Sequence, residues 1–258
     1  MSHSEGPVHR PAGLFAGFLA VAAFFTRLPV EPHATSAWRL ADSAWAFPLV
    51  GAGVGAVAAL TLFLTQLVGL GTGVAALLSV AASLVLTGGL HEDGLADTAD
   101  GFFGGRDREE KLAILRDSRH GTYGVLAILL SVLLRAAALA GIGDPIHAGL
   151  ALIAAHAASR AALPAVMWGL TPARPDGLGA TAGTPRFGAA LTAALIGGAI
   201  TLTALGPGRG VIVFCLAAVF VFAMAAVARR QIGGYTGDVL GSLQQIGEVV
   251  ILLAAAAR

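Results

Sequence analysis

The chain has very few of the residues that disulfide-bonded or nucleic-acid-binding proteins rely on. Its 258 residues include one cysteine, Cys215, and one lysine, Lys111, and only 12% of them are charged. A single cysteine excludes both an intramolecular disulfide and a zinc cluster of several thiolates, so we expect Cys215 to pack within an apolar helix. The formal net charge is +1. No basic run is interleaved with aromatic residues, and we expect no nucleic-acid partner.

Apolar residues and glycine are abundant instead. The hydrophobic fraction is 56%, the mean hydropathy is +0.80, and there are 35 glycines. A soluble domain of this length cannot bury so much apolar surface. Long apolar runs between breakers predict an all-α polytopic bundle that lies in the lipid bilayer as one domain, 1–258. About eight spans are expected, near 11–28, 44–68, 73–91, 122–142, 147–170, 188–205, 209–228 and 239–257.

The first of these spans has an alternative interpretation. Arg10 precedes an apolar core that contains Ala20-Val21-Ala22, a pattern also found in signal peptides. The apolar run continues through Phe24 and Phe25, and no soluble domain follows it. A span is therefore the favoured interpretation.

Basic residues segregate to one side of this arrangement. Eight spans place the loops around 27–43, 92–121, 171–187 and 229–238 together, and most of the acids lie there too. These loops hold Arg27, Arg39, Arg106, Arg108, Lys111, Arg116, Arg119, Arg174, Arg186, Arg229 and Arg230. The positive-inside rule then makes this side cytoplasmic and puts both termini outside. We expect a multi-pass protein of the cell (inner) membrane whose active face is in the cytoplasm.

The longest polar segment, 92–121, begins with a dense group of acids. Asp93, Asp97 and Asp100 are spaced i, i+4 and i+7, so they share one stripe if the third span continues as a helix past His91. Clustered carboxylates repel one another unless a cation neutralises them, and oxygen ligands suit Mg²⁺ first and Mn²⁺ second. A merely solvated helix end is the alternative, but acids at a helix C-terminus oppose the macrodipole. Glu92 lies off the stripe, and its role stays open.

The same segment continues with basic and hydroxyl side chains. A short amphipathic helix capped by Asp107, with Glu110 three residues on, is expected first. Arg116, Ser118 and Arg119 follow, and arginine forks next to a metal can clamp a pyrophosphate. A juxtamembrane loop whose arginines only set the topology is the alternative.

Ionisable residues also occur inside the predicted spans. Arg135, Arg160 and Glu248 are each either functional or members of a buried pair, because charges at membrane depth are costly. Asp238, near the start of the last span, can serve as a metal ligand, as a base or as an N-cap. Gly51 and Gly55 have the spacing of close helix packing, which we favour over phosphate binding.

Four motifs, taken together, resemble one known family. They are FFTRLPV at 24–30, FPLVG at 47–51, the run GGLHEDGLADTADGFFGGRDREEKLAILRDSRHGTYG at 88–124, and GYTGDVLG at 234–241. Their content and order closely resemble cobalamin synthase, the adenosylcobinamide-GDP ribazoletransferase family. The resemblance implies a polytopic, Mg²⁺-dependent transferase. Such an enzyme joins adenosylcobinamide-GDP to α-ribazole, or to α-ribazole 5′-phosphate, and releases adenosylcobalamin, or its 5′-phosphate, and GMP.

The resemblance also suggests residue roles. The family's D-G-x-x-D motif falls on Asp93, Gly94 and Asp97, with Asp100 as the next acid. Our hypothesis assigns metal binding and catalysis to Asp93, Asp97 and Asp100, a metal or base role to Asp238, and substrate binding to Arg116, Ser118 and Arg119, with Arg27 and Arg160 as lesser candidates. His120 is a position where we expect the family to vary, so it receives no role. A homo-oligomer, or a complex with other corrinoid-pathway enzymes, is compatible with this assignment.

Two other classes remain open at this stage. A lipid phosphotransferase of the CDP-alcohol type also uses acids on membrane helices, but its signature needs Ala-Arg after D-G-x-x, whereas Ala96 is followed by Asp97. An ion transporter would use Arg135, Arg160 and Glu248. That class predicts acids at mid-membrane depth, whereas most of the acids here cluster at one rim.

Overall fold

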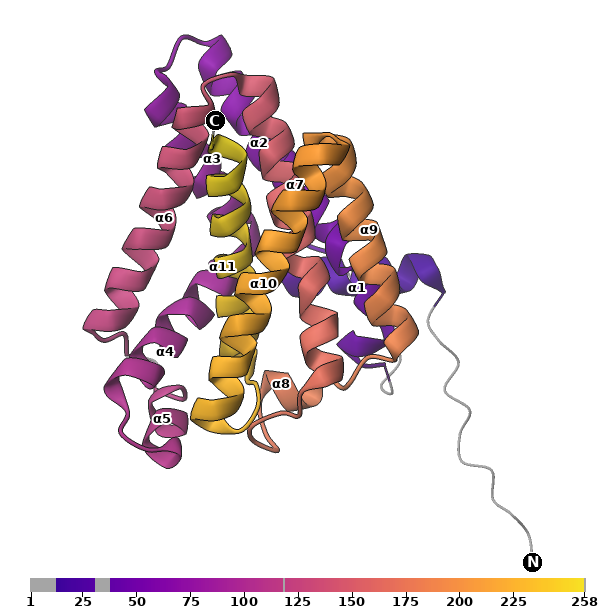
Figure 1. Cartoon of the computed structure of the whole chain (residues 1–258), viewed down its shortest axis with the longest axis vertical. Helices are drawn as coiled ribbons and strands as arrows, with labels where there is room; N and C mark the ends of the chain where they lie inside the picture. The colour runs from indigo at the N-terminus through magenta and orange to yellow at the C-terminus, as the bar shows by residue number, and fades with distance from the viewer. Residues whose placement is uncertain (1–12, 31–37, 118, 258) are drawn as a thin grey trace, which may run out of the picture.

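The computed structural model describes residues 13–30, 38–117 and 119–257, and over these residues the chain is a bundle of helices (Figure 1). The elements are α1 (Leu14–Phe25), the 3-10 helix η1 (Leu40–Ala46), α2 (Phe47–Leu67), α3 (Thr72–Thr87), α4 (Leu90–Gly104), α5 (Arg108–Ile114), α6 (Thr122–Ile142), α7 (Pro145–Gly169), α8 (Leu178–Thr181), α9 (Phe187–Leu205), α10 (Pro207–Ile232) and α11 (Gly237–Ala256). The all-α prediction is confirmed.

Within the described residues, six helices are long and apolar enough to cross a membrane. They are η1 together with α2, and α6, α7, α9, α10 and α11, while α3 and α4 form a pair bent by 92° that can supply a seventh crossing. The expected span at 11–28 departs most from the structure, because the helix found there, α1, has only 12 residues. At about 1.5 Å per residue it is roughly 18 Å long, well short of the ~30 Å hydrocarbon core. In Figure 1 it runs across the neighbouring helices.

This difference leaves the grouping of the loops unchanged. The predicted loops stay on one side of the bundle, because α1 precedes all of the crossings. The predicted sides of the two ends of the described chain change instead. With seven crossings, residues 13 and 257 lie on opposite sides of the membrane, whereas the eight predicted spans put both ends outside.

The outward faces of the long helices are apolar. Leu130 and Leu133 on α6, Leu195 on α9 and Val219 on α10 are each more than half exposed. Such a surface is costly in water and suited to lipid tails. Cys215 is exposed on the same face of α10 as Val219, four residues on, which fits a lipid-facing role.

Helix α2 packs closely against α7 through small residues. An added Cβ at Gly55 would lie 2.7 Å from the carbonyl oxygen of Leu152, and one at Gly51 would collide with the carbonyl of His156. No side chain larger than hydrogen fits there without moving the backbone. The structure therefore supports the packing interpretation of this glycine pair.

Enlarging Gly55 should destabilise the bundle. We expect Gly55→Leu to lower the midpoint of thermal unfolding in detergent by about 5 °C or more, because overpacking costs about 1–3 kcal/mol. Gly53→Leu is the matched control, since an added Cβ at Gly53 on the same helix meets nothing within 4 Å. Equal midpoints for the two variants would contradict the close contact.

The third span ends earlier than predicted. Helix α3 stops at Thr87, and Gly88 and Gly89 follow with φ of +67° and +70°. Two successive left-handed residues suit glycine, which has no Cβ, and they turn the chain into α4. The acids therefore lie on a separate helix, with Glu92 and Asp93 in its first turn. For Glu92 and Asp93, our expectation that the acids oppose the helix dipole was wrong, because the N-terminal turn favours negative charge.

The predicted loops gather at one end of the bundle. Arg108 at the start of α5 donates to the carbonyl oxygens of Ile232 and Ala173, at 2.9 and 2.7 Å. The N–H of Arg27 donates to the carbonyl of Leu86, which brings the first loop to the bend between α3 and α4. Asp107 caps α5 by accepting from the N–H of Glu110, as predicted. The loops of four distant segments thus form one surface around α4.

Candidate functional site

Two carboxylates and an imidazole lie together on this surface. Asp93 and Asp97 lie one turn apart on α4, and His120 comes from the loop before α6. His120 Nε2 is 3.7 Å from Asp93 Oδ1, and its Nδ1 is 3.6 Å from Asp97 Oδ1. One ligand atom from each residue lies within 4.8 Å of the others, so the three can hold a metal ion. We call this group the acid site.

Glycine brings Asp238 toward the acid site. An added Cβ at Gly94 would lie 2.7 Å from the carbonyl oxygen of Asp238, and one at Gly241 would lie 3.2 Å from that of His91. Helices α4 and α11 therefore cross in backbone contact between the two aspartates of the D-G-x-x-D motif. Thr236, rather than Asp238, caps α11, and its hydroxyl also donates to Asp238 Oδ2. The Asp238 carboxylate remains available for chemistry.

Asp100 takes a different place from the one predicted. Its Oδ2 accepts from the N–H of Gly121 at 2.6 Å, and its Oδ1 accepts from Gly124 at 2.9 Å. The N–H groups in the first turn of a helix lack intrahelical partners, and a carboxylate satisfies them well. The structure thus does not bring Asp100 into the acid site. It fixes the turn that directly follows His120.

Both predicted phosphate-binding arginines that the structure describes are exposed and paired with acids. Arg116 Nη2 lies 2.9 Å from Asp176 Oδ1, and Arg119 forms a fork on Asp117 with a shortest contact of 2.6 Å. Hydrogen bonds from Arg119 lower the pKa of Asp117 to about 2. Ser118, the third predicted member, lies outside the described residues. Exposed pairs of this kind are weak, so a phosphate can replace the carboxylates.

The lesser candidates, Arg27 and Arg160, lie in different parts of the structure. Arg27 is exposed at the bend, where its guanidinium lies against Gly88. Arg160 is only 1% exposed, donates to the carbonyl oxygen of His156 at 3.1 Å and lies over the ring of Phe25. The structure places Arg160 in the interior of the bundle instead of at the acid site.

Sequence reasoning missed Arg174 and gave His120 no role. Arg174 Nη2 lies 3.7 Å from Asp238 Oδ2, and its Nη1 is buried without a hydrogen-bond partner. A parallel bridge between Pro172 and Tyr235 brings the two segments together. The only sequence signal for Arg174 was the basic character of its loop.

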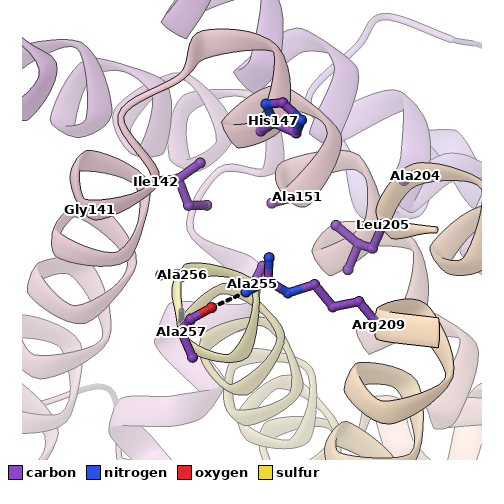
Figure 2. A pocket seen from close by; sticks show the side chains of 10 residues that line it. All are labelled: Gly141, Ile142, His147, Ala151, Ala204, Leu205, Arg209, Ala255, Ala256 and Ala257. Atoms are coloured by element: carbon purple, nitrogen blue, oxygen red, sulfur yellow. Dashed lines mark hydrogen bonds between the residues drawn. The ribbon is translucent and has the colours of Figure 1, made fainter.

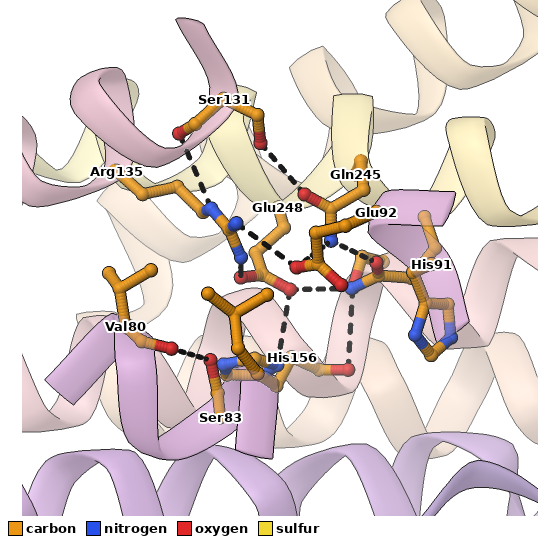
Figure 3. A network of polar contacts seen from close by, with 12 residues as sticks. Val80, Ser83, His91, Glu92, Ser131, Arg135, His156, Gln245 and Glu248 are labelled. Carbon is orange, nitrogen blue, oxygen red and sulfur yellow. Dashed lines mark hydrogen bonds and ion pairs between the residues drawn. The ribbon is translucent and has the colours of Figure 1, made fainter. Parts of the chain in front are cut away.

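The intramembrane charges form a closed network between α4, α6, α7 and α11 (Figure 3). Arg135 contacts Glu248 at 2.9 Å and Glu92 at 3.0 Å, and all three are buried. Gln245 donates to Glu92, and His156 Nδ1 lies 3.1 Å from Glu248. Glu92, whose role was open, is therefore a partner of Arg135, and Arg135 and Glu248 pair as one of the alternatives predicted.

Two pockets flank this network. The first lies at the end of the bundle opposite the acid site. It is lined mainly by small apolar residues, with Arg209 donating to the carbonyl oxygen of Ala257 (Figure 2). The second is walled by apolar side chains such as Phe24 and Met167, and Asp93 and Asp238 contribute to its lining. Only the second pocket is therefore placed to serve the acid site.

These features define a polytopic membrane protein whose loop end carries a candidate site for a divalent cation and a phosphate-bearing ligand. The sequence comparisons name the family within this class. Residues 17–256 match the family described as cobalamin-5-phosphate synthase, and the chain belongs to that family. The resemblance inferred from the motifs is confirmed.

Curated relatives carry the name adenosylcobinamide-GDP ribazoletransferase. One from Bradyrhizobium diazoefficiens is 49% identical over 247 residues, covering 95% of this chain and 94% of the relative. Another from Mesorhizobium japonicum is 46% identical over 232 residues, covering 90% and 89%, respectively. A third from Azorhizobium caulinodans is 43% identical over 254 residues, covering 95% and 96%. No solved structure matches the chain.

Proposed function

We propose that this chain is a membrane-bound adenosylcobinamide-GDP ribazoletransferase. It joins adenosylcobinamide-GDP to α-ribazole, or its 5′-phosphate, and releases adenosylcobalamin, or its 5′-phosphate, and GMP. The observation that carries the proposal is the acid site of Asp93, Asp97 and His120, which adjoins a pocket in a member of this family. Relatives of nearly the same length that carry this name support it.

The reaction transfers the cobinamide phosphoryl group from GMP to an alcohol. A ribose hydroxyl of α-ribazole attacks the phosphorus on the cobinamide side of the pyrophosphate. A new P–O bond forms, the P–O bond to GMP breaks, and GMP leaves. The hydroxyl proton needs an acceptor, and Asp238 is a candidate because it lines the pocket together with Asp93. Such transfers depend on positioning and charge neutralisation more than on covalent catalysis.

The residues of the acid site fit a bound Mg²⁺. Asp93 and Asp97 supply carboxylate oxygens, and substrate phosphate and water commonly complete the coordination of this ion. A bound Mg²⁺ would neutralise negative charge on the pyrophosphate. His120 can add a nitrogen ligand, which Mn²⁺ accepts more readily than Mg²⁺. Arg174 pairs with Asp238, and Arg116 and Arg119 lie in the segment that carries His120, so their guanidinium groups are suited to the remaining phosphate oxygens.

The loop end is proposed to face the cytoplasm of a cell (inner) membrane. Lys111 on α5, Arg229 and Arg230 in the last turn of α10, and Arg106 between α4 and α5 lie at this end. The positive-inside rule favours the cytoplasm for such a surface. A cytoplasmic orientation also exposes the site to nucleotide-activated substrates that are made in the cell.

The transporter alternative loses its main support. It relied on intramembrane charges, but Arg135 contacts both Glu248 and Glu92 within a buried network. Charges paired in this way serve the packing of helices against one another. No described contact requires them to carry an ion.

Turnover is the direct test of the proposed function. We expect the purified protein in detergent to release GMP from adenosylcobinamide-GDP only when α-ribazole and Mg²⁺ are both present. Excess EDTA should stop release, because the pyrophosphate would lose its charge neutralisation, and added Mg²⁺ should restore it. Absence of GMP release with α-ribazole and with its 5′-phosphate, from protein shown to be folded, would discard the proposed function.

A further inference from the structure

The second pocket contains a buried imidazole ring with one nitrogen that lacks a hydrogen-bond partner. Its apolar wall comes from α1, α2, α4, α7 and α11 and includes Phe24, Phe25, Phe47, Leu163, Met167 and Leu240. His91, near the start of α4, also lines it and is 3% exposed. Nε2 of His91 is buried and has no hydrogen-bond partner. An unpaired buried polar atom is unfavourable unless a ligand completes it.

The surroundings of His91 assign its proton. Nδ1 of His91 lies 3.5 Å from Arg160 Nη2, and a guanidinium can only donate. Nδ1 is therefore the acceptor, and the proton of the neutral ring is on Nε2. Arg160 is itself held by the carbonyl oxygen of His156, so this tautomer is set from outside the pocket. The pocket thus presents one N–H donor within an aromatic and aliphatic wall.

We propose that this pocket binds the base of α-ribazole. The base is a flat, uncharged, dimethylated benzimidazole whose free ring nitrogen can only accept a hydrogen bond. That nitrogen accepts from His91 Nε2–H, and the ring packs against the phenyl groups of Phe24 and Phe25. The inference rests on the proposed function and deepens it by assigning the nucleoside its own subsite.

Chemistry selects this occupant over the others. The pyrophosphate is charged and unsuited to an apolar wall, and the guanine and adenine bases of the second substrate carry N–H donors that such a wall leaves unpaired. A lipid acyl chain suits the wall but offers no acceptor to the N–H of His91. A flat aromatic base with a free acceptor nitrogen and no N–H donor satisfies both features, and the centroid of the Phe25 ring already lies 5.5 Å from that of His91.

The pocket also reaches the acid site. His91 and Asp93 are both on α4 and both line the pocket, and Asp93 belongs to the acid site. In the proposed binding mode, a base held at His91 extends its sugar toward Asp93 and Asp238. The nucleoside would enter the reaction with its hydroxyl beside the carboxylates.

Equilibrium binding of α-ribazole tests this subsite without requiring turnover. Labelled α-ribazole is dialysed against full-length protein in detergent, without Mg²⁺ and without the corrinoid substrate. His91→Phe, which keeps an aromatic ring but removes the donor, should weaken binding about tenfold. His147→Phe is the matched control, because His147 is an exposed histidine in the first turn of α7, far from this pocket. It should bind like the wild type.

An analogue separates the hydrogen bond from folding defects. In the corresponding dimethylindole ribonucleoside, carbon replaces the free ring nitrogen. The wild type should bind it about tenfold more weakly than α-ribazole, whereas His91→Phe should bind the two equally. The wild-type comparison needs no variant, so it remains decisive if His91→Phe fails to fold.

The outcomes are distinct. Equal wild-type affinity for the two nucleosides, continued tenfold discrimination by folded His91→Phe, or no binding of α-ribazole would each overturn the subsite. Weakened binding of adenosylcobinamide-GDP by His91→Phe, with α-ribazole unaffected, would do the same and assign the pocket to the corrinoid. The wild type could discriminate between the two nucleosides, and His91→Phe could lose that discrimination, while the wild type releases no GMP. This result would support the subsite and contradict the proposed transfer.

Discussion

Asp97→Asn is expected to lower the rate of GMP release at least about 10³-fold while the protein stays folded. The substitution keeps the shape of the side chain but removes one of the two carboxylates that can hold the cation. GMP release at saturating substrates measures the rate, and thermal unfolding in detergent measures folding. Added Mn²⁺ or Mg²⁺ should raise the unfolding midpoint of the wild type, because ligands stabilise the state that binds them, and should raise that of Asp97→Asn much less.

Asp144→Asn is the matched control for this prediction. Asp144 caps α7 at the end opposite the acid site and accepts from the N–H of His147. Its replacement should leave both GMP release and the metal-induced shift near the wild-type values. Wild-type turnover by Asp97→Asn would remove the metal role from this residue.

Of the single substitutions proposed here, Arg135→Met is expected to lower the free energy of unfolding most. Arg135 bridges Glu248 and Glu92 inside the bundle, and its side chain is 1% exposed. Its loss would leave two buried carboxylates without their cationic partner, which costs about 3–5 kcal/mol. Equilibrium unfolding in mixed micelles measures the change. Activity should fall as well, because Glu92 lies directly before Asp93 and its pairing holds the start of α4.

A double variant separates the charge imbalance from lost packing. Arg135→Met combined with Glu92→Gln removes one cation and one anion, while Glu248 keeps its contact with His156. Since a buried ion pair is often replaceable at little cost, we expect the double variant to recover most of the stability. A double variant as unstable as Arg135→Met would show that the guanidinium acts through packing, and a stable Arg135→Met would contradict the network itself.

Local patterns predicted much of this protein. Apolar runs placed the six long helices, because a membrane-spanning helix satisfies its own backbone and needs only length and hydropathy. The cap of α5 by Asp107 and the packing role of Gly51 and Gly55 were also foreseen, since both depend on residues a few positions apart. The motif around Asp93 and Asp97 led to the family before any fold was known.

The predicted spans were wrong where a short helix or a single turn sets the course of the chain. The run at 11–28 is apolar enough for a span, yet α1 ends at Phe25 after 12 residues. Nothing in the hydropathy of 73–91 distinguishes a continuous helix from one broken at Gly88 and Gly89. That break moved the acids from the end of one helix to the start of another.

The sequence by itself determined the helical class, the grouping of charged loops at one end, and the candidate acids, because each depends on composition or on spacing along one segment. Only the tertiary structure decided which groups meet. It paired Arg135 with Glu92 and Glu248, turned Asp100 toward the amides of α6, and brought His120 and Arg174 to the carboxylates. The physical reason is that each of these contacts joins segments far apart in the chain, and helix crossing at positions such as Gly94 sets their distance.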